Sequence, residues 1–164
     1  MTAPIRWPAE AVWEAVAPLL PGFTVEVLPS IDSTNTELMR RARAGQTEPT
    51  LLVAEQQTAG RGRLGRVWQS DVGASLMLSL GLPMAPRDWS GLSLAVGVSV
   101  AESLQPTLPP LEPGQPPRIG LKWPNDLWLS GDRKLGGILV ETASFVAPQA
   151  AHPAPAHGTA TRYV

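Results

Sequence analysis

The chain has 164 residues and a formal net charge of −1, which fits one domain with a buried core and excludes a general electrostatic attraction to nucleic acid or to membrane surfaces. Its composition, 43% hydrophobic and 16% charged, is typical of a globular protein rather than a disordered one. Because the sequence contains no cysteine, disulfides, thiolate metal sites and cysteine nucleophiles are excluded.

Cellular location is predicted from what the sequence lacks. No apolar run approaches the roughly 20 residues of a membrane span. The first residues, MTAPIRWPAEAVWEAV, show no basic start followed by an apolar run, so a signal peptide is not expected. We therefore predict a cytoplasmic protein without membrane association.

The first half of the chain is predicted to alternate helices and strands. Apolar spacing predicts a helix over residues 8–20, and a second, short helix that follows residues 32–35, runs through Leu38 and ends at Gly45. Strands are predicted over residues 23–28, 51–54 and 74–82, the last with a mostly buried pattern. Residues 57–68, here named the Arg-rich loop, separate the second and third strands.

The second half begins with a predicted helix over residues 88–104, capped by Asp88 and packed through Leu92, Leu94, Ala95, Val98 and Val100. A proline-dense connector, residues 105–117, follows. Strands are predicted over residues 119–123, 127–129 and 134–142. This order of elements predicts the α+β class, with helices packed on a mixed, mainly antiparallel sheet.

The C-terminal residues differ in composition. Residues 145–161 are rich in Ala, Pro and His and show no periodicity, which predicts a flexible loop. Its two histidines, His152 and His157, have no carboxylate near them in sequence, which disfavours a metal site. Residues 162–164 are predicted to open a strand. We therefore divide the chain into a core, residues 1–144, and a tail, residues 145–164.

The Arg-rich loop is the strongest chemical signal. It carries three arginines and three glycines, and no acidic residue lies within it. Planar guanidinium groups on a pliable backbone suit phosphates and carboxylates. Residues 60–65 also match G-x-G-x-x-G, but a dinucleotide site requires a following helix, and a strand is predicted there. A solvated basic loop without a ligand is the plain alternative.

The second signal is the run Asp32-Ser33-Thr34-Asn35 before the short helix. Such residues commonly cap a helix N-terminus, and that role alone would explain them. Hydroxyl and amide groups at a helix N-terminus also form a neutral polar pocket, which could bind a ureido group through donors and acceptors without charge.

The third signal is Lys122-Trp123-Pro124-Asn125-Asp126, followed by residues 133–141, RKLGGILVE. Charged side chains at a proline corner between apolar strands indicate a specific structural or chemical role, because burying an unpaired charge is costly. One alternative is a structural ion pair between Lys122 and Asp126 that closes the turn. Another is that Asp126 binds Mg²⁺ or accepts a proton from an amine. The chain has only two Lys, Lys122 and Lys134, and only two Asn, and all four lie in these signal segments.

Together these segments resemble the biotin–protein ligase family. The family's signatures are S-T-N at a helix start, G-R-G-R-x-G-R followed by Trp, K-W-P-N-D, and K-x-x-G-I-L-V-E. All four are present in that order, within residues 33–141. The resemblance implies an enzyme that converts biotin and ATP to biotinyl-AMP, and that then transfers biotin to a lysine of a biotin carboxyl carrier protein, with Mg²⁺ beside the nucleotide.

The resemblance also implies a biotin site. Its members are Ser33, Thr34, Asn35 and Gln57 at the ureido ring, Gly60, Arg61, Gly62 and Arg63 at the biotin carboxylate and the ATP phosphates, Lys134 at the carboxylate and the bridging oxygen, and Gly137 and Ile138 along the tail. The nucleotide site is implied to contain Trp68, Lys122, Asn125 and Asp126, with Asp126 also at Mg²⁺. The implied catalytic residues are Lys134, Arg61, Arg63 and Asp126.

Two departures from the family pattern lead to further expectations. About 30 residues precede Ser33, too few for the DNA-binding domain that some members carry, so DNA binding is not expected. Members also continue into a further strand segment and a small barrel after the last motif, so a truncated chain is expected. Two alternatives follow: a biotin-binding fragment without turnover, and the related lipoate or octanoyl ligases. The resemblance leaves the oligomeric state open, a homodimer among the options.

Overall fold

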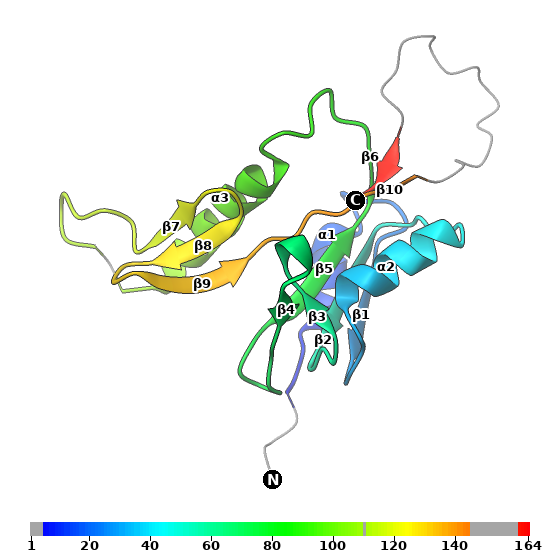
Figure 1. The fold of residues 1–164 in the computed structure, drawn as a ribbon, viewed down its shortest axis with the longest axis horizontal. Coiled ribbons are helices and arrows are strands. Elements are labelled where there is room, and N and C mark those ends of the chain that lie inside the picture. Colours follow the sequence, from blue (N-terminus) through cyan, green and yellow to red (C-terminus); the bar gives the residue numbers. More distant parts are fainter. Residues whose placement is uncertain (1–4, 110, 145–160) are drawn as a thin grey trace. The chain divides into compact units, whose positions relative to one another are not determined.

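A computed structural model of the chain describes residues 5–109, 111–144 and 161–164 (Figure 1). The chain divides into two compact units, each described here by itself. Unit 1 comprises Met1–Arg87 and Glu141–Val164, and unit 2 comprises Asp88–Val140. None of the helices in the described parts of the chain has the length and apolarity needed to span a bilayer.

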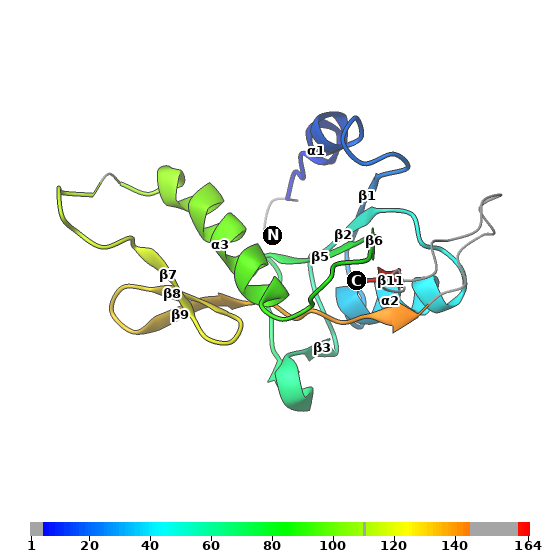
Figure 2. The same ribbon diagram turned by 90° about the horizontal axis from the view of Figure 1, so that it is seen from above.

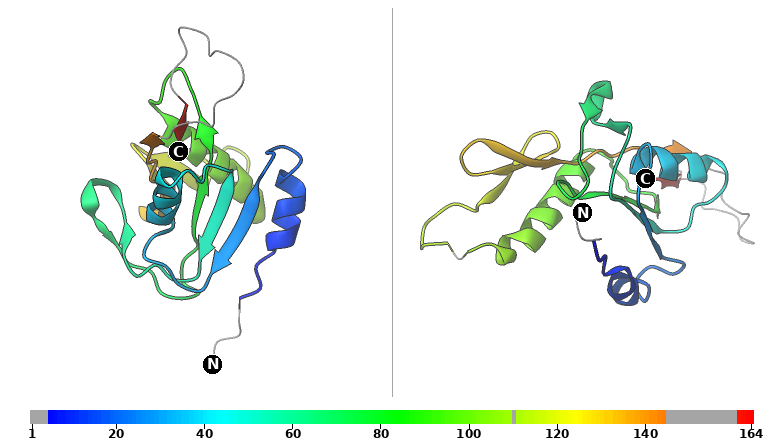
Figure 3. Two further views of the ribbon diagram at one scale, coloured as in Figure 1. Left: turned by 90° about the vertical axis from the view of Figure 1, so that its right-hand side faces the viewer. Right: turned by 90° about the horizontal axis from the view of Figure 1, so that it is seen from below.

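Unit 1 is built on a three-stranded mixed sheet in the order β1-β2-β5. Strand β1 (Thr24–Leu28) pairs in parallel with β2 (Thr50–Ala54), which pairs antiparallel with β5 (Met77–Gly81). Parallel neighbours need a crossover connection, and α2 (Thr34–Arg43) supplies it. Helix α1 (Ala9–Val16) lies on the opposite face of the sheet from α2 (Figure 2; Figure 3, left).

The core of unit 1 lies between α2 and the sheet. Leu38, Met39 and Ala42 come from one face of α2 and pack with Leu52 of β2. Strand β5 was predicted to be mostly buried, and the structure corrects this: its residues alternate between buried and exposed. The reason is that α2 covers only one face of β5, where Met77, Ser79 and Gly81 lie.

The last described residues complete this core. Strand β11 (Arg162–Tyr163) lies between β10 (Ala143–Ser144) and β6 (Pro83–Met84), antiparallel to both. The strand predicted to open at residue 162 is therefore confirmed. Tyr163 is 1% exposed and belongs to the core cluster. Its phenol lies against Gly81, where an added Cβ would approach the phenol oxygen to 2.2 Å.

The Arg-rich loop is more ordered than a simple loop. Strand β3 (Gly60–Arg61) pairs with β4 (Val67–Trp68), and the short 3₁₀ turn η1 (Arg63–Gly65) joins them. A strand, β5, follows this hairpin rather than a helix, as predicted, which argues against a dinucleotide fingerprint.

Unit 2 packs helix α3 (Leu92–Leu104) on an antiparallel sheet of β7 (Ile119–Lys122), β8 (Asp126–Leu129) and β9 (Arg133–Gly137). The 3₁₀ turn η2 (Gln105–Thr107) ends the helix. Strand β9 ends at Gly137, earlier than the predicted residue 142. Between helix and sheet, Gly97 is buried, and an added Cβ there would lie 2.7 Å from Leu121.

Two expectations for α3 were wrong. Asp88 does not cap the helix, because the helix begins after Gly91, whose φ is +78°. The carboxylate of Asp88 instead accepts hydrogen bonds from the hydroxyl of Ser90 and from its backbone N–H (2.8 Å), and these two bonds lower the pKa of Asp88. The predicted packing stripe also differs, since Ala95 and Val98 are exposed and Gly97 is the buried position.

The α+β class is confirmed by helices on mixed and antiparallel sheets. The predicted boundary at residue 144 stays a prediction. The predicted flexible loop, with His152 and His157, lies outside the described residues except for Thr161.

Replacing Tyr163 should destabilise unit 1. Tyr163→Ala removes a fully buried aromatic ring, and we expect it to lower the free energy of unfolding by about 3–5 kcal/mol. Tyr163→Phe removes only the hydroxyl, which lies near the side chain of Thr50, and should cost about 1 kcal/mol. Urea unfolding measures both, and equal effects would contradict the burial of the ring.

Alkaline pH should also destabilise the fold. Burial raises the pKa of the Tyr163 phenol above its ordinary value of 10.0. The folded state therefore holds this proton more tightly than the unfolded chain, so stability from this group is unaffected below pH 10.0 and falls as the pH rises above it. Tyr163 is the only tyrosine in the chain, so phenolate absorbance reports its titration directly. An ordinary titration midpoint would contradict this expectation.

Candidate functional site

The N-terminus of α2 brings the uncharged polar residues of unit 1 together. Ser33 and Thr34 are 4% and 3% exposed. The Ser33 hydroxyl oxygen accepts from the backbone N–H of Thr36 (3.3 Å), which confirms that Ser33 caps the helix. The side-chain oxygen of Gln57 accepts from both the backbone N–H (2.7 Å) and the hydroxyl (3.0 Å) of Thr34. The two motifs that contain these residues therefore meet directly.

Ser79 of β5 extends this network, although the sequence analysis gave it no role. Its hydroxyl lies 2.7 Å from the Thr34 hydroxyl oxygen and also contacts the side-chain oxygen of Asn35. A hydroxyl has one proton to donate, so it serves one of these acceptors at a time. The signal that could have identified Ser79 is a polar residue at an inward-facing position of an apolar strand.

Asp32 has a structural role at the same helix end. Its carboxylate accepts from the backbone N–H of Ser33 (2.7 Å) and pairs with Arg40 (2.8 Å). The bond from Ser33, followed by the charge and hydrogen bond of Arg40, holds the pKa of Asp32 below its usual value.

Glu141, which comes 80 positions after Arg61 in the sequence, joins Arg61 to the same helix end. Its Nη2 donates to the hydroxyl oxygen of Thr36 (3.0 Å) and to both carboxylate oxygens of Glu141 (3.2 and 3.3 Å). Glu141 also accepts from the side-chain amide of Asn35 (3.2 Å). The Arg-rich loop contains no acid, and the pairing of Arg61 with Glu141, 80 positions away, was not predicted.

The remainder of the Arg-rich loop extends from Gly60 and Arg61, here named the root of the loop. Gly60 is buried, and an added Cβ would lie 2.7 Å from the carbonyl oxygen of Trp68 and 3.2 Å from Nε2 of Gln57. At the tip, Leu64 has a φ of 57° and is 90% exposed. The side chain of Arg63 is exposed as well. Gly60 thus allows a close approach that a side chain would prevent.

In unit 2, four chemically active side chains share one face of the β7-β8-β9 sheet. Lys122 lies opposite Asp126 in the ladder, and Trp128 lies opposite Lys134. Because Asp126 and Trp128 are two positions apart on β8, all four side chains point to the same side. The ammonium of Lys134 lies 2.8 Å from the carboxylate of Asp126, and the ammonium of Lys122 lies 3.8 Å from the centre of the Trp128 ring.

This arrangement corrects one alternative from the sequence. Asp126 pairs with Lys134, not with Lys122 as the turn-closing alternative proposed. Lys122 instead makes a cation–π contact. The indole N–H of Trp128 donates to the carboxylate of Asp132 (3.1 Å), which anchors the ring beneath Lys122. Trp128 was not singled out from the sequence.

The end of β9 lies against this ion pair. An added Cβ at Gly137 would lie 3.4 Å from both Oδ1 of Asp126 and Nζ of Lys134. The neighbouring residue Ile138 exchanges two hydrogen bonds with Asn125: its backbone N–H donates to the Asn125 carbonyl (2.8 Å), and its carbonyl accepts from the Asn125 side chain (2.9 Å). The last two motifs are therefore joined.

A comparison with known families identifies the family to which a chain with this arrangement belongs. A family model described as the biotin/lipoate A/B protein ligase family matches residues 27–151. The chain belongs to this family.

Curated relatives and solved structures agree with this membership. The chain is 42% identical over 125 residues to a biotin–[acetyl-CoA-carboxylase] ligase of Mycobacterium tuberculosis, and 45% identical over 124 residues to the bifunctional ligase/repressor BirA of Escherichia coli. These alignments cover 73% and 74% of this chain, but only 44% and 36% of the relatives. The chain thus spans less than half the length of these two relatives.

Two solved structures resemble the chain in fold, each with a TM-score of 0.59 and 28% sequence identity. One is the biotin acetyl coenzyme A carboxylase synthetase of Helicobacter pylori with bound biotinylated ATP, for which 85% of this chain and 57% of that chain are covered. The other is the biotin protein ligase of Leishmania major in complex with biotinyl-5-AMP, for which 77% of this chain and 59% of that chain are covered.

Within this family member, the predicted site residues fall into two groups. Unit 1 brings together Ser33, Thr34, Asn35, Gln57 and the root of the Arg-rich loop, including Gly60 and Arg61. Unit 2 brings together Lys122, Asn125, Asp126, Lys134, Gly137 and Ile138. Which ligand each group binds stays a prediction, as do the roles of Gly62, Arg63 and Trp68.

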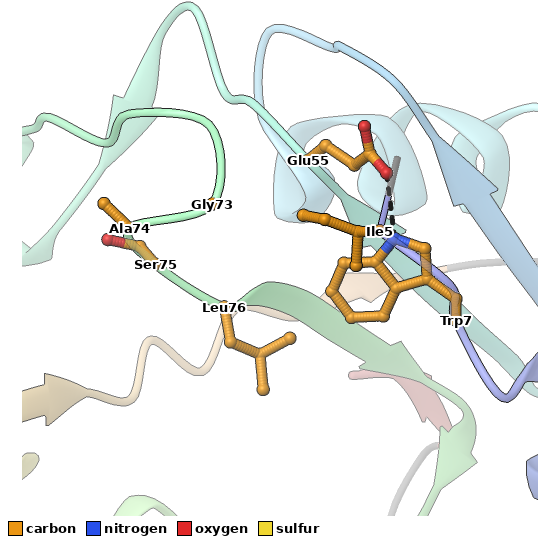
Figure 4. Close-up of a pocket in the computed structure, with 7 residues that line it drawn as sticks. All are labelled: Ile5, Trp7, Glu55, Gly73, Ala74, Ser75 and Leu76. Atoms are coloured by element: carbon orange, nitrogen blue, oxygen red, sulfur yellow. Dashed lines mark hydrogen bonds between the residues drawn. The ribbon is translucent and has the colours of Figure 1, made fainter. Parts of the chain in front are cut away.

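The described residues contain no cluster suited to a metal ion, and the cavity of unit 1 is lined by none of the predicted site residues. Across residues 5–109, 111–144 and 161–164, no three His, Cys, Asp or Glu residues are grouped to bind a metal ion. A cavity of about 490 Å³ in unit 1 is lined by Ile5, Trp7, Glu55 and residues 73–76, none of them a predicted site residue (Figure 4). There the indole N–H of Trp7 donates to Glu55 (3.0 Å).

Gly60→Ala should disrupt the root of the Arg-rich loop. The new Cβ would lie 2.7 Å from backbone, which cannot move without breaking the β3–β4 pairing. We expect a loss of about 1–3 kcal/mol in the free energy of unfolding, the usual cost of overpacking. Gly120→Ala is the matched control, because nothing lies within 4 Å of a Cβ added there. Equal unfolding midpoints for the two variants would contradict this geometry.

Proposed function

We propose that this chain is the ligand-binding core of a biotin–protein ligase. It activates biotin with ATP to biotinyl-5′-AMP and transfers the biotin to a lysine of a biotin carboxyl carrier protein. The observation that carries the proposal is the meeting of a neutral hydrogen-bonding network with the guanidinium of Arg61 at one helix N-terminus. Biotin carries a group that matches each of them: a neutral ureido ring for the network and a carboxylate for the guanidinium.

The ureido ring is assigned to the network of Ser33, Thr34, Asn35 and Gln57. A ureido group needs hydrogen-bond donors for its carbonyl and acceptors for its N–H groups, but no charge. The Gln57 side-chain oxygen already accepts two bonds from Thr34, so its Nε2 is the end available to donate to a ligand. That nitrogen lies beside Gly60, at the start of the Arg-rich loop.

The activation step requires two anions to be brought together. A carboxylate oxygen of biotin attacks the α-phosphorus of ATP, the bond to the β-phosphate breaks, and pyrophosphate leaves with its electron pair. No protein nucleophile is needed. We assign Arg61, Gly62 and Arg63 to the carboxylate and the phosphates, because guanidinium and backbone N–H groups neutralise charge that develops on phosphoryl oxygens.

Unit 2 is assigned to the nucleotide and to the second step. Lys134 is proposed to bind the biotin carboxylate and the bridging oxygen of the adenylate, and Lys122 and Asn125 to bind the nucleotide, a role also proposed for Trp68 of unit 1. In the transfer step the lysine amine of the carrier attacks the acyl carbon, AMP leaves, and the amine loses a proton. Asp126 is assigned to accept that proton, because its carboxylate lies beside Lys134, the group assigned to the adenylate.

Mg²⁺ enters the proposal as part of the substrate Mg·ATP. Such ions are usually bound by one or two carboxylates and substrate phosphates, and Asp126 offers one carboxylate on the exposed face of the sheet, which fits that limited role. When bound, the ion would neutralise phosphate charge. The carrier protein as acceptor, the lack of DNA binding and a cytoplasmic location stay predictions.

Adenylate formation tests the proposal. The recombinant chain should convert biotin and Mg·ATP to biotinyl-AMP and pyrophosphate, which thin-layer separation of labelled biotin measures. Biotin binding in calorimetry without any adenylate would favour the alternative of a binding fragment, which the chain's limited coverage of its relatives motivates. Absence of both would contradict the proposal. Preferred binding of lipoate over biotin in competition would place the chain in the related lipoate class.

The two lysines should differ in their effect on adenylation. We expect Lys134→Ala to reduce the rate of adenylate formation about 100-fold or more, the size of effect seen when a charged transition-state contact is lost. Lys122→Ala should have a clearly smaller effect, because its ammonium rests on Trp128. Single-turnover rates measure both, and equal losses would mean that the two roles are wrongly assigned.

A further inference from the structure

We propose that Glu141 is a positioning residue that fixes Arg61 and the root of the Arg-rich loop against the N-terminus of α2, and thereby sets the affinity for biotin. The inference rests on the proposed function for its ligand, but its contacts are independent of it. Glu141 closes the last sequence motif, yet nothing in that motif explains why an acid stands there.

The contacts of Glu141 join three separate segments. Both carboxylate oxygens lie within 3.3 Å of Nη2 of Arg61, and Oε2 also accepts from the side-chain amide of Asn35. The same Nη2 donates to the hydroxyl of Thr36. The side chain of Glu141 is 28% exposed, so water screens its charge less than in a fully exposed pair.

These contacts determine which way Arg61 points. The guanidinium group is planar and rigid, so holding Nη2 at two acceptors also sets the directions of the Nε and Nη1 hydrogens. Without the carboxylate the side chain would regain its rotamers, and binding an anion would have to order it again. Glu141 therefore lowers the entropic cost of ligand binding without needing to contact the ligand.

The backbone shows why this root matters. The N–H of Gly62 donates to the carbonyl of Arg66 (2.7 Å), which closes the hairpin one residue beyond Arg61. Beyond it, Leu64 and Gly65 adopt positive φ angles of 57° and 71°. The loop thus has a paired root held by Glu141 and a tip without strand pairing, so the tip can close over a ligand from a fixed base.

The test combines a double-mutant cycle with hydrogen exchange on the full 164-residue chain. Calorimetry would measure biotin binding by the wild type, Glu141→Gln, Arg61→Ala and the double variant, with Glu10→Gln on α1 as the matched control. Glu141→Gln should weaken binding about tenfold, as expected for the loss of one charge-assisted hydrogen bond. The double variant should bind no more weakly than Arg61→Ala alone, because both changes remove the same interaction.

Hydrogen exchange over residues 60–68 provides the second measurement. Glu141→Gln should accelerate exchange there while the melting temperature stays within a degree or so of the wild type, because the change removes no buried apolar packing. Unchanged exchange, or losses of affinity that multiply in the double variant, would overturn the inference. If the wild-type chain binds no biotin, the proposed function fails, and the exchange rates still decide the role of Glu141.

Discussion

Unit 1 depends on satisfying the buried polar N-terminus of α2. Ser33 and Thr34 are almost fully buried, and a buried hydroxyl or N–H without a partner costs about 1–3 kcal/mol. Gln57, from the segment after β2, and Ser79 of β5 supply the partners of Thr34, and the backbone N–H of Thr36 donates to the Ser33 hydroxyl oxygen. The same bonds fix the strands relative to the helix, so the groups assigned to the ureido ring are also part of the architecture.

Two of the candidate cations are paired with an acid. Arg61 pairs with Glu141, and Lys134 pairs with Asp126. A carboxylate partner restrains a flexible side chain, and a guanidinium or ammonium group carries more than one donor. Lys122 is restrained differently, by the face of Trp128. In each case the cation is oriented in advance, which reduces the cost of ordering it when an anion binds.

Close approach at glycines completes the arrangement. Gly60, Gly81 and Gly137 each lie where a Cβ would press on an essential neighbour: the Trp68 carbonyl, the Tyr163 phenol, and the pair of Asp126 and Lys134. None of these three has a positive φ, so the requirement is for space rather than for backbone freedom. At Gly81 this space lets the Tyr163 ring belong to the core of unit 1.

The sequence by itself determined the local features: the elements around residues 24–28 and 34–43, a polar cap within residues 32–35, and the motif residues with their chemical types. These depend on periodicity and on neighbours within a few positions. It could not determine that Glu141 meets Arg61, that Asp126 pairs with Lys134 rather than Lys122, or that Ser79 joins Thr34. Those partners are set by strand register and by helix packing, which bring distant side chains together and which no local pattern encodes.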